Sequence, residues 1–149
     1  MRQAVGSAFI LNLVIIFITL MMLVFVGSIS YSKAYKTKNR IINIIEDNKG
    51  YNESSISEIE TFMADTGYQI SLTSDCTKVA PNTKSSSLVY PTSSIKSGYR
   101  YCIFENKASN DNGVYYTVVT FMKFDFPIIG NYIEFPVKGE TKILSKLWD

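Results

Sequence analysis

The chain has 149 residues, with 15 Lys and Arg against 13 Asp and Glu, so its formal net charge is only +2. This near balance argues against a nucleic-acid partner, because such domains carry a strong basic excess. The absence of histidine removes the commonest general base and zinc ligand, together with any nucleophile paired with a histidine.

The first predicted element is an uncharged stretch between Arg2 and Lys33. As a helix it would extend about 45 Å, and its most apolar part, residues 9–26, about 27 Å, close to the hydrocarbon thickness of a bilayer. A cleavable secretory signal has a shorter apolar region of roughly 7–15 residues. We therefore expect a leader-like segment at residues 1–6 and a transmembrane helix at residues 7–30. A cleaved signal is the alternative, since Val26 to Ser28 resembles a cut site.

An amphipathic extension follows the anchor, over residues 31–49. Its apolar stripe recurs in steps of four and three residues, at Tyr31, Tyr35, Lys38, Ile42 and Ile45, and Ile41 and Ile44 widen it. No Pro or Gly lies between Ser28 and Lys49, and Gly50 is expected to end the helix. Two arrangements stay open: one rod from about Val5 to Asn48, or two helices with a bend near Gly27 and Ser28.

Two observations bear on which side of the membrane the rest of the chain lies. The basic cluster Lys33, Lys36, Lys38 and Arg40, best interpreted as a lipid-headgroup or solvated face, favours the cytoplasm. Cys76 and Cys102 favour the outside, because a disulfide closing a loop of about 27 residues would contribute roughly 3.5 kcal/mol to a small domain. We expect a bridge rather than two buried thiols, and an extracytoplasmic domain at residues 50–149.

Past Gly50 a short second helix is predicted. Ser55 and Glu58 form a capping pair at its start, Gly67 closes it, and its apolar face comprises Ile56, Ile59 and Phe62 or Met63. A strand is then predicted at residues 68–72. The Ser- and Thr-rich stretch at residues 73–98 is predicted to be a loop.

The strongest strand patterns come last, at residues 98–106 and 114–126, joined by a turn at Asn110 to Gly113. In the second of these, one face carries Tyr116, Val118, Met122, Phe124 and Phe126, and the other Tyr115, Thr117, Lys123 and Asp125. A final strand within residues 132–144 contains Pro136, which favours a sheet edge. The predicted fold class is α+β: a long N-terminal transmembrane and amphipathic helix packed on an antiparallel sheet of three to five strands.

No motif for catalysis, cofactor binding or metal binding appears in the sequence. Two cysteines are too few for a thiolate metal site, and the glycines form no nucleotide-binding loop. Glu58 and Glu60 are better interpreted as a solvated helix face than as a pair of catalytic acids. We therefore expect a protein that is not an enzyme and that has no cofactor.

The residues from Gly6 to about Ile45 carry a family resemblance. A short polar start ending in Gly6, an uninterrupted apolar helix, its amphipathic continuation and a small C-terminal sheet together resemble type IV pilins and pseudopilins. The outline is most similar to TadE-like proteins of tight-adherence pili and related bacterial secretion systems. The terminal stretch, residues 124–144, also resembles the ending of some TadE-like chains.

The resemblance implies a processing site and a set of partners. In such families a membrane peptidase cuts after a glycine, which would map to Gly6 and leave Ser7 as the new N-terminus. The expected partners are membrane lipid, other pilin-like subunits and the pilus or secretion machinery. Pilins carry an early glutamate, whereas this chain has Ala8, Phe9, Leu11 and Asn12 there. That departure favours a minor pilin or pseudopilin over a major filament subunit.

Within the apolar helix, a few residues are candidates for helix packing. Asn12 could hydrogen-bond a neighbouring helix, with a value of about 1 kcal/mol, or it could be satisfied by water and headgroups. The small residues Gly6 and Ser7, and Gly27 and Ser28, would allow close approach of another helix. The alternative to an assembling subunit is a membrane-tethered ligand-binding or adhesive domain.

Overall fold

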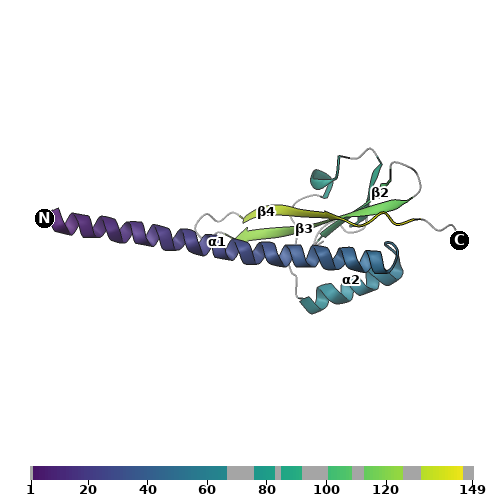
Figure 1. Ribbon diagram of the computed structural model, residues 1–149, viewed down its shortest axis with the longest axis horizontal. Coiled ribbons are helices and arrows are strands. Elements are labelled where there is room, and N and C mark those ends of the chain that lie inside the picture. The colour runs from purple at the N-terminus through teal and green to yellow at the C-terminus, as the bar shows by residue number, and fades with distance from the viewer. Residues whose placement is uncertain are drawn as a thin grey trace.

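The computed structural model describes residues 2–66, 76–82, 85–91, 101–108, 113–125 and 132–145. Its helices and strands are, in chain order, α1 (Arg2–Asp47), α2 (Glu53–Thr66), the 3-10 turn η1 (Cys76–Val79), β1 (Ser86–Tyr90), β2 (Tyr101–Lys107), β3 (Val114–Asp125) and β4 (Tyr132–Glu140). The predicted α+β class is confirmed. We call the second half of α1, together with α2, η1 and the sheet, the head. The sheet and α2 pack on different sides of that half, and the first half of α1 projects beyond the head (Figure 1).

Helix α1 is one continuous rod of 46 residues, without a break at Gly27 or Ser28, so the two-helix alternative is wrong. Its end differs slightly from the expectation. Lys49, with φ 55°, takes the left-handed position, and Gly50 follows with φ 151°. The amide of Lys49 donates to the carbonyl of Glu46, and that of Gly50 to the carbonyl of Ile45. This pair of bonds satisfies carbonyls in the last turn and stops the helix.

Helix α2 begins earlier than the predicted capping pair. Asn52 is the cap: its Oδ1 accepts from the Ser55 amide at 2.9 Å, and the Ser55 Oγ accepts from the Asn52 amide at 2.8 Å. Ser55 therefore sits at the third helical position and reciprocates the cap instead of being the cap itself. Ser55 was expected to be the cap because Glu58 follows it at the capping-box spacing.

The sheet is antiparallel, in the order β1-β2-β3-β4. Strand β4 is an edge strand, as Pro136 indicated, since proline cannot donate a ladder hydrogen bond. The other edge, β1, lies inside the stretch predicted to be a loop, so that prediction is wrong there. Its sequence, Ser-Ser-Leu-Val-Tyr, is too polar and too short to be recognised without the β2 strand that pairs with it.

The sheet buries side chains on both of its faces. On one face, residues of β2 and β3, including Ile103, Tyr116 and Val118, form a core with isoleucines of α1 and with Ile59 and Met63 of α2. On the other face, a second cluster is made by Cys76, Cys102, Phe104, Val119 and Phe121. Tyr116 and Val118 lie on the core face, as predicted, but the opposite face, expected to be uncovered, is buried as well.

Several expected features lie outside the described residues. They are the strand at residues 68–72, the end of the second helix at Gly67, the turn residues Asn110 to Asn112, and Phe126.

Candidate functional site: the two halves of the N-terminal helix

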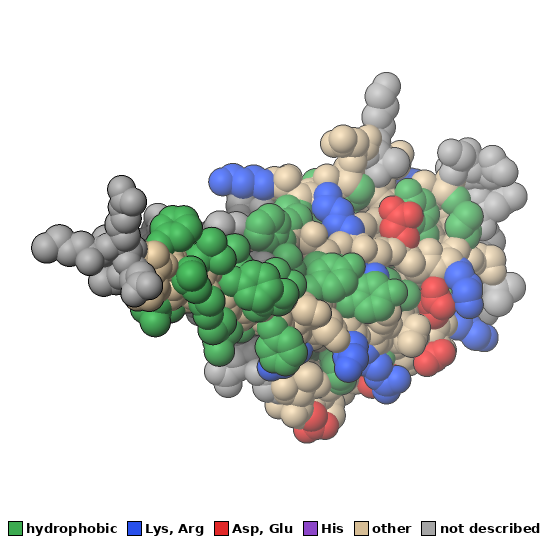
Figure 2. Space-filling model, turned by 60° about the vertical axis from the view of Figure 1, so that its left-hand side comes forward, with side chains coloured by type: hydrophobic (Ala, Val, Ile, Leu, Met, Phe, Trp, Pro, Cys, Tyr) green, Lys and Arg blue, Asp and Glu red, His purple; other side chains and the backbone are tan. Residues whose placement is uncertain are grey.

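The projecting half of α1 is uncovered and apolar. Every side chain from Gly6 to Val26 is exposed, including Phe9 at 69% and Phe25 at 68%. Figure 2 shows these hydrophobic side chains gathered along the projecting rod, in contrast to the mixed surface of the head. Soluble monomers rarely expose so large an apolar surface. The projecting half therefore requires an apolar environment.

One helix among the described residues, over Gly6–Asp47, is long and apolar enough to cross a membrane, and none of its most apolar part is buried in the protein. A core helix of a soluble protein would be mostly buried instead. Helix α1 is thus a possible membrane span or secretory signal that continues without interruption into a folded head.

The residues proposed for processing and packing all lie on this continuous helix. Gly6 is exposed, and a Cβ placed there would meet no atom within 4 Å. Ser7 and Asn12 are also exposed, and Asn12 forms no side-chain hydrogen bond within the described part of the chain. Gly27 is half-buried and Ser28 is exposed. The Asn12 amide is thus open to a partner from outside the chain.

The second half of α1 forms the spine of the head. Its completely buried residues are Ala34, Ile41, Ile44 and Ile45, and Ile42 is half-buried. The Thr120 hydroxyl donates to the Ala34 carbonyl at 3.0 Å, which pins β3 to the helix. The predicted stripe is thus confirmed from Lys38 onward. It differs at Tyr31 and Tyr35, which are 50% and 44% exposed, because the buried face there passes through Ala34 and Thr37 instead.

Lys38 is buried, which agrees with its place on the predicted stripe and not with its place in the basic cluster. Its side chain passes so close to β4 that a Cβ on Gly139 would lie 2.7 Å from the Lys38 Cδ. The ammonium nitrogen lies 4.3 Å from the centroid of the Tyr35 ring, and Tyr35 in turn stacks on Tyr31. The ring face offsets the burial of the charge.

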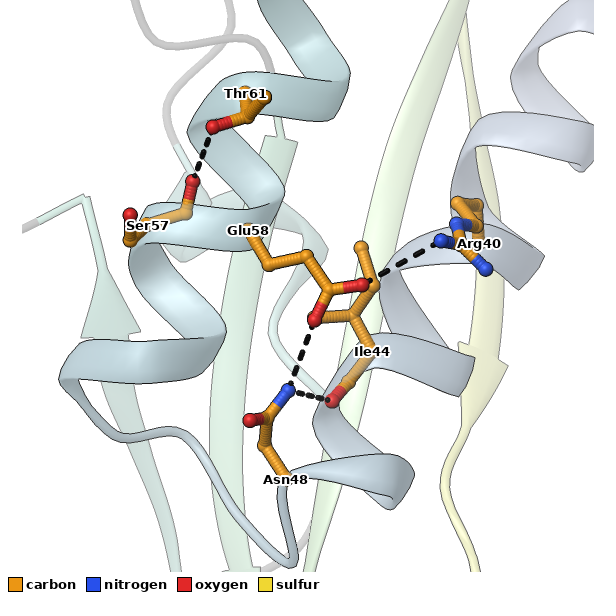
Figure 3. Close-up of polar contacts among 6 residues, drawn as sticks. All are labelled: Arg40, Ile44, Asn48, Ser57, Glu58 and Thr61. Carbon is orange, nitrogen blue, oxygen red and sulfur yellow. Dashed lines mark hydrogen bonds and ion pairs between the residues drawn. The ribbon is translucent and has the colours of Figure 1, made fainter.

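Arg40 is exposed, as expected of a solvated face, and it also contacts α2. One of its nitrogens lies 3.4 Å from the Glu58 Oε1, and the Asn48 Nδ2 donates to the Glu58 Oε2 at 3.1 Å (Figure 3). Asn48 also donates to the Ile44 carbonyl at 2.9 Å. Glu58, weighed in the sequence as one of a pair of acids, therefore joins α2 to the end of α1.

Cys76 and Cys102 form a disulfide, which confirms the bridged alternative. The bridge attaches η1 to the face of β2 that points away from α1, and it lies within the second buried cluster. Because disulfides persist in oxidising compartments, the bridge favours an extracytoplasmic head.

Tyrosines gather where α2, β1, β2 and β3 meet. The Tyr90 and Tyr101 rings stack with centroids 4.4 Å apart, and the Tyr116 hydroxyl donates to Glu105 at 3.2 Å. Burial, with smaller contributions from Tyr90 and Glu60, raises the pKa of Tyr51 to about 12. Burial also raises the pKa of Tyr101 and of Tyr116. These phenols stay protonated at neutral pH and act as core residues.

The described residues contain no group of three or more Cys, Asp or Glu side chains placed to hold a metal ion. The arrangement instead offers a long apolar surface and a rigid attachment. Two contacts that hold the sheet close to α1 were not predicted: the contact of Gly139 with Lys38 and the hydrogen bond from Thr120 to the Ala34 carbonyl. A glycine inside a strand does signal close backbone approach, but it does not show which helix approaches.

Comparison with known protein families, with curated proteins and with solved structures finds no match to this chain.

Proposed function

We propose that this chain is a non-enzymatic, membrane-anchored, pilin-like protein that contributes, as a minor pilin or pseudopilin, to a Tad-type pilus or a related secretion apparatus. One observation carries the proposal. A single helix is uncovered and apolar over its first half, and its second half is the spine of a disulfide-bonded head.

The uncovered half of α1 can serve both as a membrane anchor and as a packing surface, and neither role requires an active site. Lipid can solvate the uncovered half of α1, and packing against similar helices can keep the same surface dry after the chain leaves the bilayer. Because α1 has no break, the position of the head follows directly from the position of the anchor. The exposed Asn12 amide adds a polar contact that a neighbouring helix could satisfy.

A span exchange tests the role of the helix. Residues 7–26 would be replaced by an unrelated apolar sequence of equal length, and the head would be followed at the cell surface by protease accessibility. We expect the head still to be displayed, while crosslinks to neighbouring subunits and assembly of the apparatus are lost. Retained assembly would contradict the proposal and favour a tethered adhesive or ligand-binding domain.

Two further measurements test the membrane arrangement. Amino-terminal sequencing of the mature protein should find Ser7 first if a peptidase cuts after Gly6. A thiol reagent that cannot cross the membrane, applied to intact cells carrying Ser87→Cys on the exposed surface of β1, should label the head. Labelling only after lysis would place the head in the cytoplasm and contradict the proposal.

A further inference from the structure

Three exposed aromatic side chains, Tyr31, Tyr35 and Phe135, lie at the boundary between the two halves of α1. They are 50%, 44% and 45% exposed. Scattered exposed aromatics need no explanation, but helical spacing and strand register place these three on one side of the molecule and within about 9 Å of one another along the helix axis.

The shared side follows from helical spacing. Residues 31, 35, 38 and 42 recur in steps of four, three and four, so they lie along one stripe of α1. On that stripe, Lys38 and Ile42 are the closest neighbours of Gly139 on β4. Tyr31 and Tyr35, whose rings stack with centroids 6.1 Å apart, therefore lie on the side of α1 next to β4.

The shared level follows from the strand register. Val137 pairs with Thr120, which bonds the Ala34 carbonyl, whereas Gly139 lies against Lys38 and Ile42. Strand β4 thus runs in the same direction as α1. Phe135 precedes Val137 by two residues, which places it about 7 Å nearer the projecting half, and Tyr31 lies about 4.5 Å nearer than Ala34. Phe135 also shares the helix-facing side of β4 with Val137 and Gly139, because strand side chains alternate.

This level is the end of the uncharged stretch, since Lys33 is the first charged residue after Arg2. Tyrosine favours the boundary between hydrocarbon and headgroups, where its apolar ring and its polar hydroxyl are both satisfied. The Phe135 ring has no polar group, and it adds apolar surface beside the two tyrosines on the hydrocarbon side of that boundary. The rigid continuity of α1 leaves no linker that could lift the head away from the bilayer.

We infer that Tyr31, Tyr35 and Phe135 form an aromatic collar that lies in the phospholipid headgroup layer and seats the head directly on the membrane. This inference rests on the membrane anchor of the proposed function. The occupant of the collar is lipid, because the collar continues the apolar surface of the span up to the first charges.

Depth-dependent fluorescence quenching tests the collar in the full chain reconstituted into phosphatidylcholine vesicles. Trp148, the only tryptophan, is first removed by Trp148→Phe. A reporter is then introduced singly as Phe135→Trp, as Phe17→Trp within the span, or as Leu88→Trp. Leu88 is the matched control, because it is 42% exposed on the opposite edge strand, β1.

We expect a headgroup-attached nitroxide to quench the position-135 reporter at least about twofold more than the position-88 reporter, as contact with the interface requires. Aqueous iodide should quench position 88 more strongly, and lipids brominated deep in their chains should quench position 17. Tyr31→Trp serves as a second collar reporter, and it decides the question if Phe135→Trp perturbs folding by circular dichroism.

The collar and the anchor can fail separately. If position 17 is quenched but the collar reporter behaves like position 88, the collar is overturned and the anchor stands. Shielding of the collar reporter from both iodide and headgroup nitroxide would indicate a protein neighbour and would also overturn it. If deep bromines do not quench position 17, the anchor itself is wrong.

Discussion

Gly113 lies where the start of β3 meets the end of the described chain. A Cβ on Gly113 would lie 2.6 Å from the Ile143 Cγ2 and 2.8 Å from the Leu144 carbonyl oxygen. That carbonyl also accepts from the Val114 amide at 3.0 Å, so it has little freedom to move.

Gly113→Ala should therefore destabilise the head by about 1–3 kcal/mol, the usual cost of overpacking. Urea unfolding of the full chain in detergent micelles measures the effect. Gly139→Ala should cost less, because the atoms that it meets belong to the ends of the Lys38 and Ile42 side chains. Gly6→Ala, with open space around it, should leave the head unchanged. Equal losses at all three positions would contradict the expectation that steric contact determines the effect, since Gly6 has open space around it.

The buried tyrosines give the head a dependence on alkaline pH. Burial raises the pKa of Tyr51 from the usual tyrosine value of 10.0 to about 12, and it also raises the pKa of Tyr101. Because the pKa of Tyr51 is higher in the folded protein than in the unfolded chain, its contribution to the folding stability of the head is complete below about pH 10. That contribution is lost as the pH rises through about 12.

Tyrosinate absorbance and far-ultraviolet circular dichroism, recorded together against pH, check this expectation. The exposed tyrosines should ionise first, and the last phenols should ionise together with the loss of secondary structure. Tyr51→Phe should weaken the dependence, because it removes one late-titrating group. Ionisation of all ten tyrosines near pH 10 with an intact fold would contradict the assignment.

At the scale of elements, two kinds of contact hold α2 on α1. The ion pair of Arg40 with Glu58 is half-exposed, with side-chain exposures of 51% and 45%. Ile59, on the other hand, is completely buried in the core shared by α1, α2 and the sheet. Exposed ion pairs contribute about 0–1 kcal/mol, whereas truncating a buried isoleucine costs about 2–5 kcal/mol. The apolar contact therefore dominates.

Ile59→Ala should lower the unfolding free energy by about 2–5 kcal/mol, and Arg40→Ala by less than about 1 kcal/mol. Urea titration at low and high salt separates the two contributions, because salt screens only the ion pair. Ile56→Ala, at a half-buried position on the same helix, is the matched control and should fall between them. A loss at Arg40 as large as that at Ile59 would show that the polar network is the dominant link.

The elements also show what local patterns can predict. A long N-terminal helix could be predicted because its apolar run and its lack of Pro or Gly after Ser28 are local properties, although the sequence left open a bend at Gly27 and Ser28 that the structure does not have. The β1 strand could not be, because a short Ser-rich segment becomes a strand only by pairing with β2. The burial of Lys38 likewise depends on β4, which lies about a hundred residues away in the chain.

At the scale of the whole molecule, the disulfide joins η1 to the sheet across a sequence separation of 26 residues. Replacing both cysteines, as Cys76→Ala with Cys102→Ala, should lower the unfolding free energy by about 3.5 kcal/mol, from loop entropy in the unfolded chain.

Denaturant unfolding of the double variant in micelles measures this loss. The single variants serve as controls for the free thiol that each leaves behind. Unchanged stability of the double variant would mean that the second buried cluster, with Phe104, Val119 and Phe121, holds η1 without the bridge.

The sequence alone determined the α+β class, a long N-terminal helix and the edge position of β4, because each depends on composition, on periodicity or on the missing donor of a proline. It left open whether that helix bends at Gly27 and Ser28 and whether Cys76 and Cys102 are bridged. Tertiary structure alone decided which side chains of α1 are covered, that Cys76 and Cys102 are bridged, and that the sheet is buried on both faces. Those features arise from contacts between segments far apart in the chain, and a helix carries no local signal of where a strand will cross it.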